Sequence, residues 1–325
     1  MLRAALLPLA AALVLTGATA GGAASATTPA TRGVVLINTN LDFENASAAG
    51  TGIVLTKTGE VITNNHVIRG ATTIKVVVPA TKKTYTATVL GYNIADDIAL
   101  LKLPGATNLA TATRGNSATL KIGQTTRAVG NANGGGKLVT TTGRITARSR
   151  TISVQDESGD VTRLKGLIET SARLVPGDSG GPLLDAAGHV IGIDAAGSPS
   201  FGIDNAAPGY AIPINRAVTI AKQVEARQAS ALVHIGDTAF IGLLVSRIPQ
   251  GIAVGSVVPN SPAATAGLQQ GDVITELDGA SVTSYSDLRT LLFTKHPGDS
   301  ITLGYTSATG AETSASIVLT TGPPQ

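Results

Sequence analysis

A chain of 325 residues, 43% of them hydrophobic, is long enough for two domains, although aromatic residues make up only 3% and Val, Ile, Leu and Ala must fill the cores. The net charge of +3 is small and dispersed, which argues against nucleic acid as a partner. Because cysteine is absent, thiol catalysis, disulfides and cysteine metal sites are excluded, and without a histidine or carboxylate cluster we expect neither a metal nor a cofactor.

Residues 1–26 have the pattern of a secretory signal peptide. Arg3 comes before the apolar stretch 4–16, and small residues at 18–20 and 24–26 resemble cleavage sites. The apolar stretch is short for a membrane span, whereas a signal that stays uncleaved would serve as an anchor. We therefore expect an exported protein that is secreted, periplasmic or held at the cell envelope, with a flexible leader at 27–32.

Short apolar runs separated by turn residues follow from residue 33 onward. Repeated short strands without long helices predict a mainly β fold, with a double β-barrel in a first domain that spans 33–230. The expected strands are 33–38, 52–56, 60–63, 73–78, 84–90, 98–103, 125–130, 137–147, 150–155, 162–170, 182–185, 189–194 and 209–213.

A helix over 215–227 is predicted to close this first domain. Its apolar stripe has near-helical spacing and consists of Ile214, Val218, Ala221, Val224 and Ala226. The residues that follow, including His234, are interpreted as a linker, and a second domain is expected over 235–322.

Ser179 lies on a loop between apolar strands, in Gly177-Asp178-Ser179-Gly180-Gly181-Pro182-Leu183. Small neighbours would let a peptide carbonyl approach the hydroxyl, and Gly177 would let its N–H turn inward beside that of Ser179. Two such donors stabilise the oxyanion of an acyl-transfer transition state. The heptapeptide predicts a nucleophilic serine with an oxyanion hole at Gly177 and Ser179, whereas Asp-Ser-Gly alone would indicate only a turn.

A nucleophilic serine needs a base, and the base needs an orienting acid. Of the four histidines, His66 follows an apolar run at the expected rim of a barrel, whereas His189 lies in a turn, His234 in the linker and His296 before a Pro-Gly turn. Asp97 directly precedes the apolar run 98–103, where a lone buried carboxylate would be costly. We therefore expect His66, Asp97 and Ser179 to form a catalytic triad.

The blocks 63–68, 97–102 and 177–183 resemble the three signature blocks of the HtrA (DegP/DegS-like) serine proteases, and 128–134 and 140–147 resemble further strands and loops of that family. The resemblance implies a chymotrypsin-like double β-barrel that hydrolyses peptide bonds through an acyl-enzyme, without a cofactor. The chain order His, Asp, Ser agrees with that of chymotrypsin-type enzymes.

Residues 235–322 resemble a PDZ domain in the blocks 240–243, 255–268 and 271–279, followed by an expected helix over 285–295. A PDZ groove binds a C-terminal peptide as an added strand, with backbone N–H groups on its carboxylate. By this resemblance Ile241, Gly242 and Leu243 form the carboxylate loop; the alternative is an ordinary strand start.

Some positions depart from the family pattern. Asp178 replaces the usual Asn, but the leader has no activation motif and we infer no zymogen. Arg173, near the base of the expected side-chain pocket, either favours acidic substrates or, as we prefer, faces solvent or pairs with an acid such as Asp178. The loop 39–49 is short, which favours a monomer or a homotrimer over a cage. The resemblance implies a trimer held mainly by N-terminal aromatic residues, and Phe43 is the only aromatic residue before Tyr85, which argues against the trimer.

These observations predict an exported serine endopeptidase that cuts unfolded or damaged proteins and recognises C-terminal peptides at its PDZ groove. The alternative is a peptide-binding or chaperone protein whose protease fold is idle. An esterase is disfavoured because the chain lacks a Gly-x-Ser-x-Gly motif and an alternating βα pattern.

Overall fold

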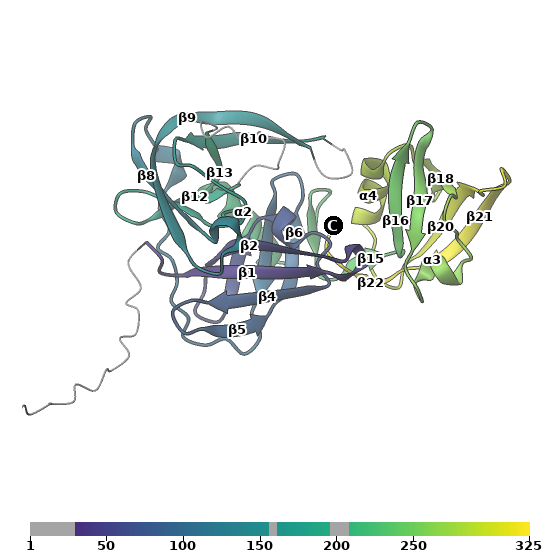
Figure 1. Cartoon of the computed structure of the whole chain (residues 1–325), viewed down its shortest axis with the longest axis horizontal. Coiled ribbons are helices and arrows are strands. Elements are labelled where there is room, and N and C mark those ends of the chain that lie inside the picture. Colours follow the sequence, from purple (N-terminus) through teal and green to yellow (C-terminus); the bar gives the residue numbers. More distant parts are fainter. Residues whose placement is uncertain (1–29, 156–160, 196–207) are drawn as a thin grey trace, which may run out of the picture.

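The structure is a computed structural model that describes residues 30–155, 161–195 and 208–325. Its described part is mostly β, as the sequence predicts, with two barrel-like sheets at one end and a smaller C-terminal domain at the other (Figure 1). The predicted signal peptide and residues 27–29 of the predicted leader lie outside the described residues. Ala30 is already buried in the core, three residues before the predicted domain start.

The first barrel is an eight-stranded sheet with the strand order β14-β6-β7-β3-β2-β1-β4-β5. Its buried faces consist of Val, Ile and Leu, with Tyr85 and Tyr92 as the large side chains. The strands are β1 (Val34–Leu41), β2 (Ala46–Val54), β3 (Glu60–Thr63), β4 (Thr73–Val78), β5 (Lys83–Thr86), β6 (Thr88–Asn93), β7 (Ile98–Lys102) and β14 (Val233–Ile235).

The second barrel is closed, with the strand order β10-β13-β12-β11-β8-β9. Its strands are β8 (Thr125–Gly130), β9 (Val139–Gln155), β10 (Val161–Thr170), β11 (Pro182–Leu184), β12 (Val190–Asp194) and β13 (Gly209–Pro213). Short helical turns stand at η1 (Asp42–Glu44), η2 (Ser117–Thr119), η3 (Ala132–Gly134) and α1 (Asn65–Ile68).

Helix α2 (Ile214–Glu225) packs across the two barrels and closes them, as predicted. Its buried positions are Ile214, Ala217, Ile220, Ala221 and Val224. The predicted stripe was therefore partly wrong, because Ala226 lies beyond the helix and is exposed while Val218 is only half-buried. The helix ends before Arg227, whose φ of 54° is left-handed.

Two predicted connections prove to be ordered structure. Most of the predicted loop 39–49 belongs to β1 and β2, which pair from Leu41 and Ala46 onward and leave only the η1 turn between them. The predicted linker at His234 is part of β14, which pairs with β6, and the His234 ring is 2% exposed between Tyr92 and Phe293.

The C-terminal domain has a sheet with the strand order β16-β17-β18-β20-β21, with β19 beside β18. Its elements are β16 (Leu243–Ile248), β17 (Gly251–Val257), α3 (Pro262–Thr265), β18 (Val273–Leu277), β19 (Ala280–Ser281), α4 (Tyr285–Phe293), β20 (Ser300–Thr306) and β21 (Glu312–Val318). Helix α4 starts at the cap residue Ser284, whose hydroxyl accepts a hydrogen bond from Asp287 N–H, and it ends two residues before the predicted 295.

Strands β15 (Thr238–Phe240) and β22 (Thr320–Gly322) form a small sheet between the two parts of the molecule (Figure 1). Phe43 of η1 stacks on Phe240 of β15, with ring centroids 5.1 Å apart. After β22 the chain returns to the first barrel, where Gly70 N–H donates to Pro324 O at 2.8 Å. None of the helices in the described ranges is long and apolar enough to cross a membrane.

Candidate active site

His66 and Asp97 are held together by two hydrogen bonds. The backbone N–H of His66, on α1, donates to Asp97 Oδ1 at 2.9 Å, and its ring Nδ1 shares a hydrogen bond with Asp97 Oδ2 at 2.7 Å. The carboxylate side chain is 10% exposed and the imidazole 40% exposed. Because Asp97 holds Nδ1, the ring has a fixed orientation and its Nε2 is directed away from the acid.

The loop of Ser179 requires glycine on both sides. Gly177 and Gly180 have φ of 93° and 83°, which is left-handed backbone that favours glycine. A Cβ on Gly177 would collide with the Asn131 carbonyl oxygen, and one on Gly180 with that of Thr51. The sequence argument explained these glycines by substrate access, whereas the structure explains them by the backbone packed against them.

Strand β2 brings the Ser179 loop and α1 to the same place. Thr51 N–H donates to Ser179 O at 2.8 Å, which attaches the loop of the second barrel to the first. A Cβ built on Gly50 would lie 2.5 Å from a methyl of Val67, the residue after His66, and 3.3 Å from Ser179 O. The Ser179 carbonyl and the side chain that follows His66 therefore both lie close to Gly50, and Ser179 is itself 6% exposed.

The peptide groups before Ser179 are fixed by specific donors. Pro176 O accepts from Asn133 N–H at 2.6 Å, and Gly177 O accepts from the Thr51 hydroxyl at 2.7 Å. In a trans peptide the C=O and N–H point in opposite directions, so the N–H of Gly177 points away from the η3 turn. The Thr51 hydroxyl also accepts from Asn131 N–H at 2.9 Å. Sequence reasoning missed Thr51, which no local pattern marks.

Two buried carboxyl groups lie behind the nucleophile. Asp178 is 3% exposed, and its burial raises its pKa to about 6, although Val175 N–H donates to Oδ2 at 2.9 Å. Asp194, at the end of β12, is fully buried; burial and the nearby Asp178 raise its pKa well above the usual value. Neither of its carboxyl oxygens has a hydrogen-bond partner among the described residues, while its backbone binds Gly180 and Gly181.

The remaining sequence candidates lie outside this centre. Arg173 is exposed, and no ion pair between described residues joins it to Asp178. His189 contacts Asp185 in a hairpin turn, with 3.2 Å between Nδ1 and Oδ2, as expected of a turn histidine. Within the described ranges, no group of three or more His, Asp or Glu side chains could hold a metal ion.

In the C-terminal domain, Ile241 and Gly242 connect β15 to β16, and Leu243 is the first residue of β16. Gly242 has a left-handed φ of 91°, and a Cβ there would collide with Ser261. The carbonyls of Ile241 and Gly242 accept from the N–H groups of Ala263 and Val258, both at 2.9 Å. Strand β16 stands at the edge of its sheet, so its outer side is available to an added strand.

Comparison with known proteins agrees with this arrangement. The family model of the trypsin-like peptidase domain matches residues 50–193, and that of the PDZ domain matches residues 239–316. The fold and the His66–Asp97 pair thus define a trypsin-like serine protease domain followed by one PDZ domain.

The chain belongs to the HtrA family of Do-like serine proteases. It is 33% identical over 291 residues to the Do-like HtrA of Lactococcus lactis, which covers 82% of this chain and 70% of that protein. It is 34% identical over 269 residues to the HtrA of Lactobacillus helveticus, covering 78% of this chain and 64% of that one.

The chain is also 34% identical over 270 residues to the periplasmic serine endoprotease DegP of Escherichia coli; this match covers 79% of this chain and 54% of DegP. The chain thus spans about half to two thirds of several curated relatives. The structure of the HtrA-type protease AlgW with tripeptide is 27% identical, with a TM-score of 0.52 and coverage of 91% of this chain and 96% of that one.

Proposed function

We propose that this protein is an exported serine endopeptidase that hydrolyses peptide bonds of unfolded or damaged proteins, with His66, Asp97 and Ser179 as its catalytic residues. The observation that carries the proposal is the His66–Asp97 pair with its two hydrogen bonds. The glycine-flanked Ser179 supports it, because its carbonyl accepts from Thr51 on the strand whose Gly50 packs against Val67, the residue after His66. The names of relatives such as DegP and DegQ of Escherichia coli, both called periplasmic endoproteases, support the activity and the export.

In this mechanism Ser179 attacks the substrate carbonyl while His66 Nε2 takes the hydroxyl proton. Asp97 keeps Nδ1 protonated and stabilises the imidazolium that forms. The N–H groups of Gly177 and Ser179 bind the oxyanion. His66 then protonates the leaving amine, and water hydrolyses the acyl-enzyme by the same base.

The PDZ domain would bind C-terminal peptides of substrates as a strand beside β16. Ile241, Gly242 and Leu243 would offer their N–H groups to the peptide carboxylate, since the carbonyls of the first two are already bonded within the domain. For assembly we retain a monomer or a homotrimer. Phe43 stacks on Phe240 of the same chain, which supports the monomer.

The test is degradation of unfolded casein by the purified protein. We expect cleavage by the wild type and a loss of at least about a thousandfold in Ser179→Ala, because the nucleophile is removed. Labelling of Ser179 by an organophosphate would agree with an activated serine. Suppression of aggregation without any cleavage by the wild type would instead favour the peptide-binding alternative.

A further inference from the structure

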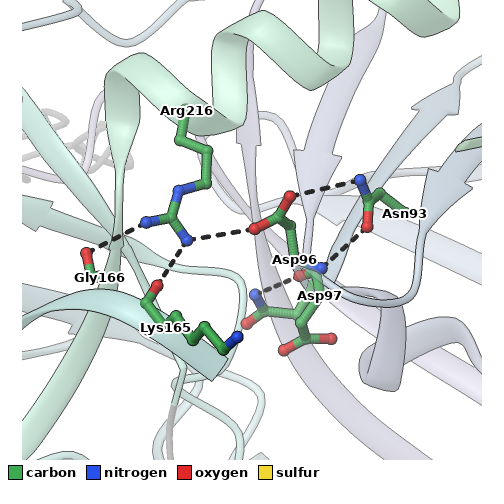
Figure 2. Close-up of polar contacts among 7 residues, drawn as sticks. Asn93, Asp96, Asp97, Lys165, Gly166 and Arg216 are labelled. Carbon is green, nitrogen blue, oxygen red and sulfur yellow. Dashed lines mark hydrogen bonds and ion pairs between the residues drawn. The ribbon is translucent and has the colours of Figure 1, made fainter. Parts of the chain in front are cut away.

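Arg216 on α2 joins the two barrels beside the turn that carries Asp97 (Figure 2). Its Nη1 donates to Asp96 Oδ1 at 3.1 Å and to Lys165 O at 2.6 Å, and its Nη2 donates to Gly166 O at 3.3 Å. Asp96 is the residue before Asp97. Arg216 lies outside the 50–193 region that the peptidase family model matches.

The turn that carries Asp97 has a backbone conformation that must be held. Asp97 has a φ of 53°, a left-handed value that few non-glycine residues adopt and that persists where the surrounding structure holds it. Within the first barrel, Asp96 N–H donates to Asn93 Oδ1 at 2.8 Å, and Asn64 Nδ2 donates to Asp97 O at 2.9 Å. The contact of Arg216 with Asp96 adds a restraint from outside that barrel.

The guanidinium is itself fixed from the side of the second barrel. Strand β10 has an irregular register between Leu164 and Leu167, and this bulge presents two consecutive carbonyls, those of Lys165 and Gly166, to Arg216. Gly166 has a φ of 67°, and a Cβ there would collide with Arg216 Nη2. The three acceptor oxygens, from Asp96, Lys165 and Gly166, surround one planar guanidinium. This arrangement suits arginine, whose several N–H groups point in fixed directions, better than lysine, whose ammonium group is a compact point charge.

The division of the site between the barrels makes such a restraint useful. His66 and Asp97 come from the first barrel, whereas Ser179 and Gly177 come from the second. A displacement of about 1 Å between reacting groups can cost on the order of a hundredfold in rate. Arg216 contacts the turn of Asp97 on one side and strand β10 on the other, so it restrains this displacement.

We propose that Arg216 is a positioning residue, which acts through Asp96 to hold Asp97 and His66 in register with Ser179. The inference rests on the proposed function of the triad. It predicts that loss of Arg216 impairs the chemical step more than substrate binding, and that the His66–Asp97 hydrogen bond becomes looser.

The test uses Arg216→Gln, Arg216→Lys and Asp96→Asn in the full chain, with Arg150→Gln as the control. Arg150 makes an ion pair with Glu169 at 2.8 Å, is 55% exposed and has no contact with the triad. For Arg216→Gln we expect kcat to fall by about ten- to a hundredfold with KM nearly unchanged. Arg216→Lys should recover part of the loss, and Asp96→Asn should add little to Arg216→Gln, because both variants remove the same Arg216–Asp96 contact.

A second readout does not depend on activity. The proton between His66 Nδ1 and Asp97 Oδ2 should give a far-downfield NMR signal in the wild type and in Arg150→Gln, and a broadened or lost signal in Arg216→Gln. An unchanged kcat and an unchanged signal in Arg216→Gln would overturn the inference. A wild type that cleaves nothing would overturn the proposed function, and the NMR signal would then decide the inference alone. If Arg216→Gln fails to fold, Asp96→Asn takes its place in both measurements.

Discussion

At the scale of single residues, the site depends on backbone that only certain residues can adopt. The hydrogen bond from Asn133 N–H to Pro176 O fixes the orientation of the peptide group between residues 176 and 177. Gly177, in the left-handed region, packs against the Asn131 carbonyl, which leaves no space for a side chain. Any larger residue must move the peptide that carries one of the two proposed oxyanion donors.

Gly177→Ala is therefore expected to lose about a hundred- to a thousandfold in kcat, as when one oxyanion donor is removed. Gly105→Ala is the matched control, because Gly105 also has a left-handed φ, 71°, but a Cβ there would meet nothing within 4 Å. It should cost stability through backbone strain alone and leave kcat unchanged. Equal kcat values in the two variants would contradict the role given to Gly177. Peptide hydrolysis and thermal unfolding measure both effects.

The raised pKa values of Asp178 and Asp194 allow the pH dependence of the protein's stability to be predicted. A carboxyl whose pKa is raised by folding binds its proton more tightly in the folded than in the unfolded state. Such a carboxyl therefore contributes to the stability of the folded protein at low pH, and this contribution is lost as the pH rises through the pKa that the group has in the folded state. For Asp178 this window runs from 3.8 to about 6, and for Asp194 the loss extends to higher pH.

Asp178→Asn and Asp194→Asn should each flatten this pH dependence and exceed the wild type in stability at pH 8, for Asp178→Asn by on the order of 2 kcal/mol. Denaturant unfolding between pH 4 and 8, in a Ser179→Ala background that prevents self-digestion, measures the effect. Asp278→Asn should act in the opposite sense, because its hydrogen bond with Lys295 lowers the pKa of Asp278. An unchanged pH profile in both variants of the buried pair would show that these carboxyl groups do not control it.

At the scale of elements, local patterns allowed most strands of the first domain and α2 to be predicted, although the expected strands 137–147 and 150–155 are the single strand β9, and α4 was expected from the resemblance to a PDZ domain. His66, Asp97 and Ser179 were recognised from motifs, and the structure brings the first two into contact. Thr51, Asn64 and Arg216 were missed, since their partners lie 126, 33 and 120 residues away in sequence and leave no local signature.

The errors have the same physical origin. His234 was placed in a linker between the two predicted domains, but the segment pairs with β6 and its ring is buried against Tyr92, so it is a strand. On α2 the burial of Ala217 and Ile220 instead of Ala226 follows from which side of the helix contacts the barrels. Tertiary contacts thus determine the secondary structure of short segments whose local propensity does not favour one conformation.

At the scale of the whole molecule, Tyr92 links the first barrel to the C-terminal domain and to the last residues of the chain. Its hydroxyl accepts from Gln325 N–H at 3.3 Å and shares a hydrogen bond with Thr238 Oγ1 at 3.2 Å, while burial raises the pKa of Tyr92 and keeps the hydroxyl protonated. Asn65 Nδ2, next to His66, donates to Gln325 O at 2.9 Å. The residues after β22 are thus attached to the helix that carries the proposed base.

Tyr92→Phe should loosen this attachment while its ring still packs on His234. We expect a loss of about 1–2 kcal/mol in stability, because buried partners remain unsatisfied. The Gly70 amide, which donates to Pro324 O, should exchange its hydrogen faster. Tyr85→Phe is the control, since Tyr85 is a buried tyrosine on β5 of the same barrel, and no hydrogen bond between described residues joins its side chain to residues 323–325. If Gly70 keeps equal protection in both variants, the Tyr92 hydroxyl does not hold the C-terminal segment against the first barrel.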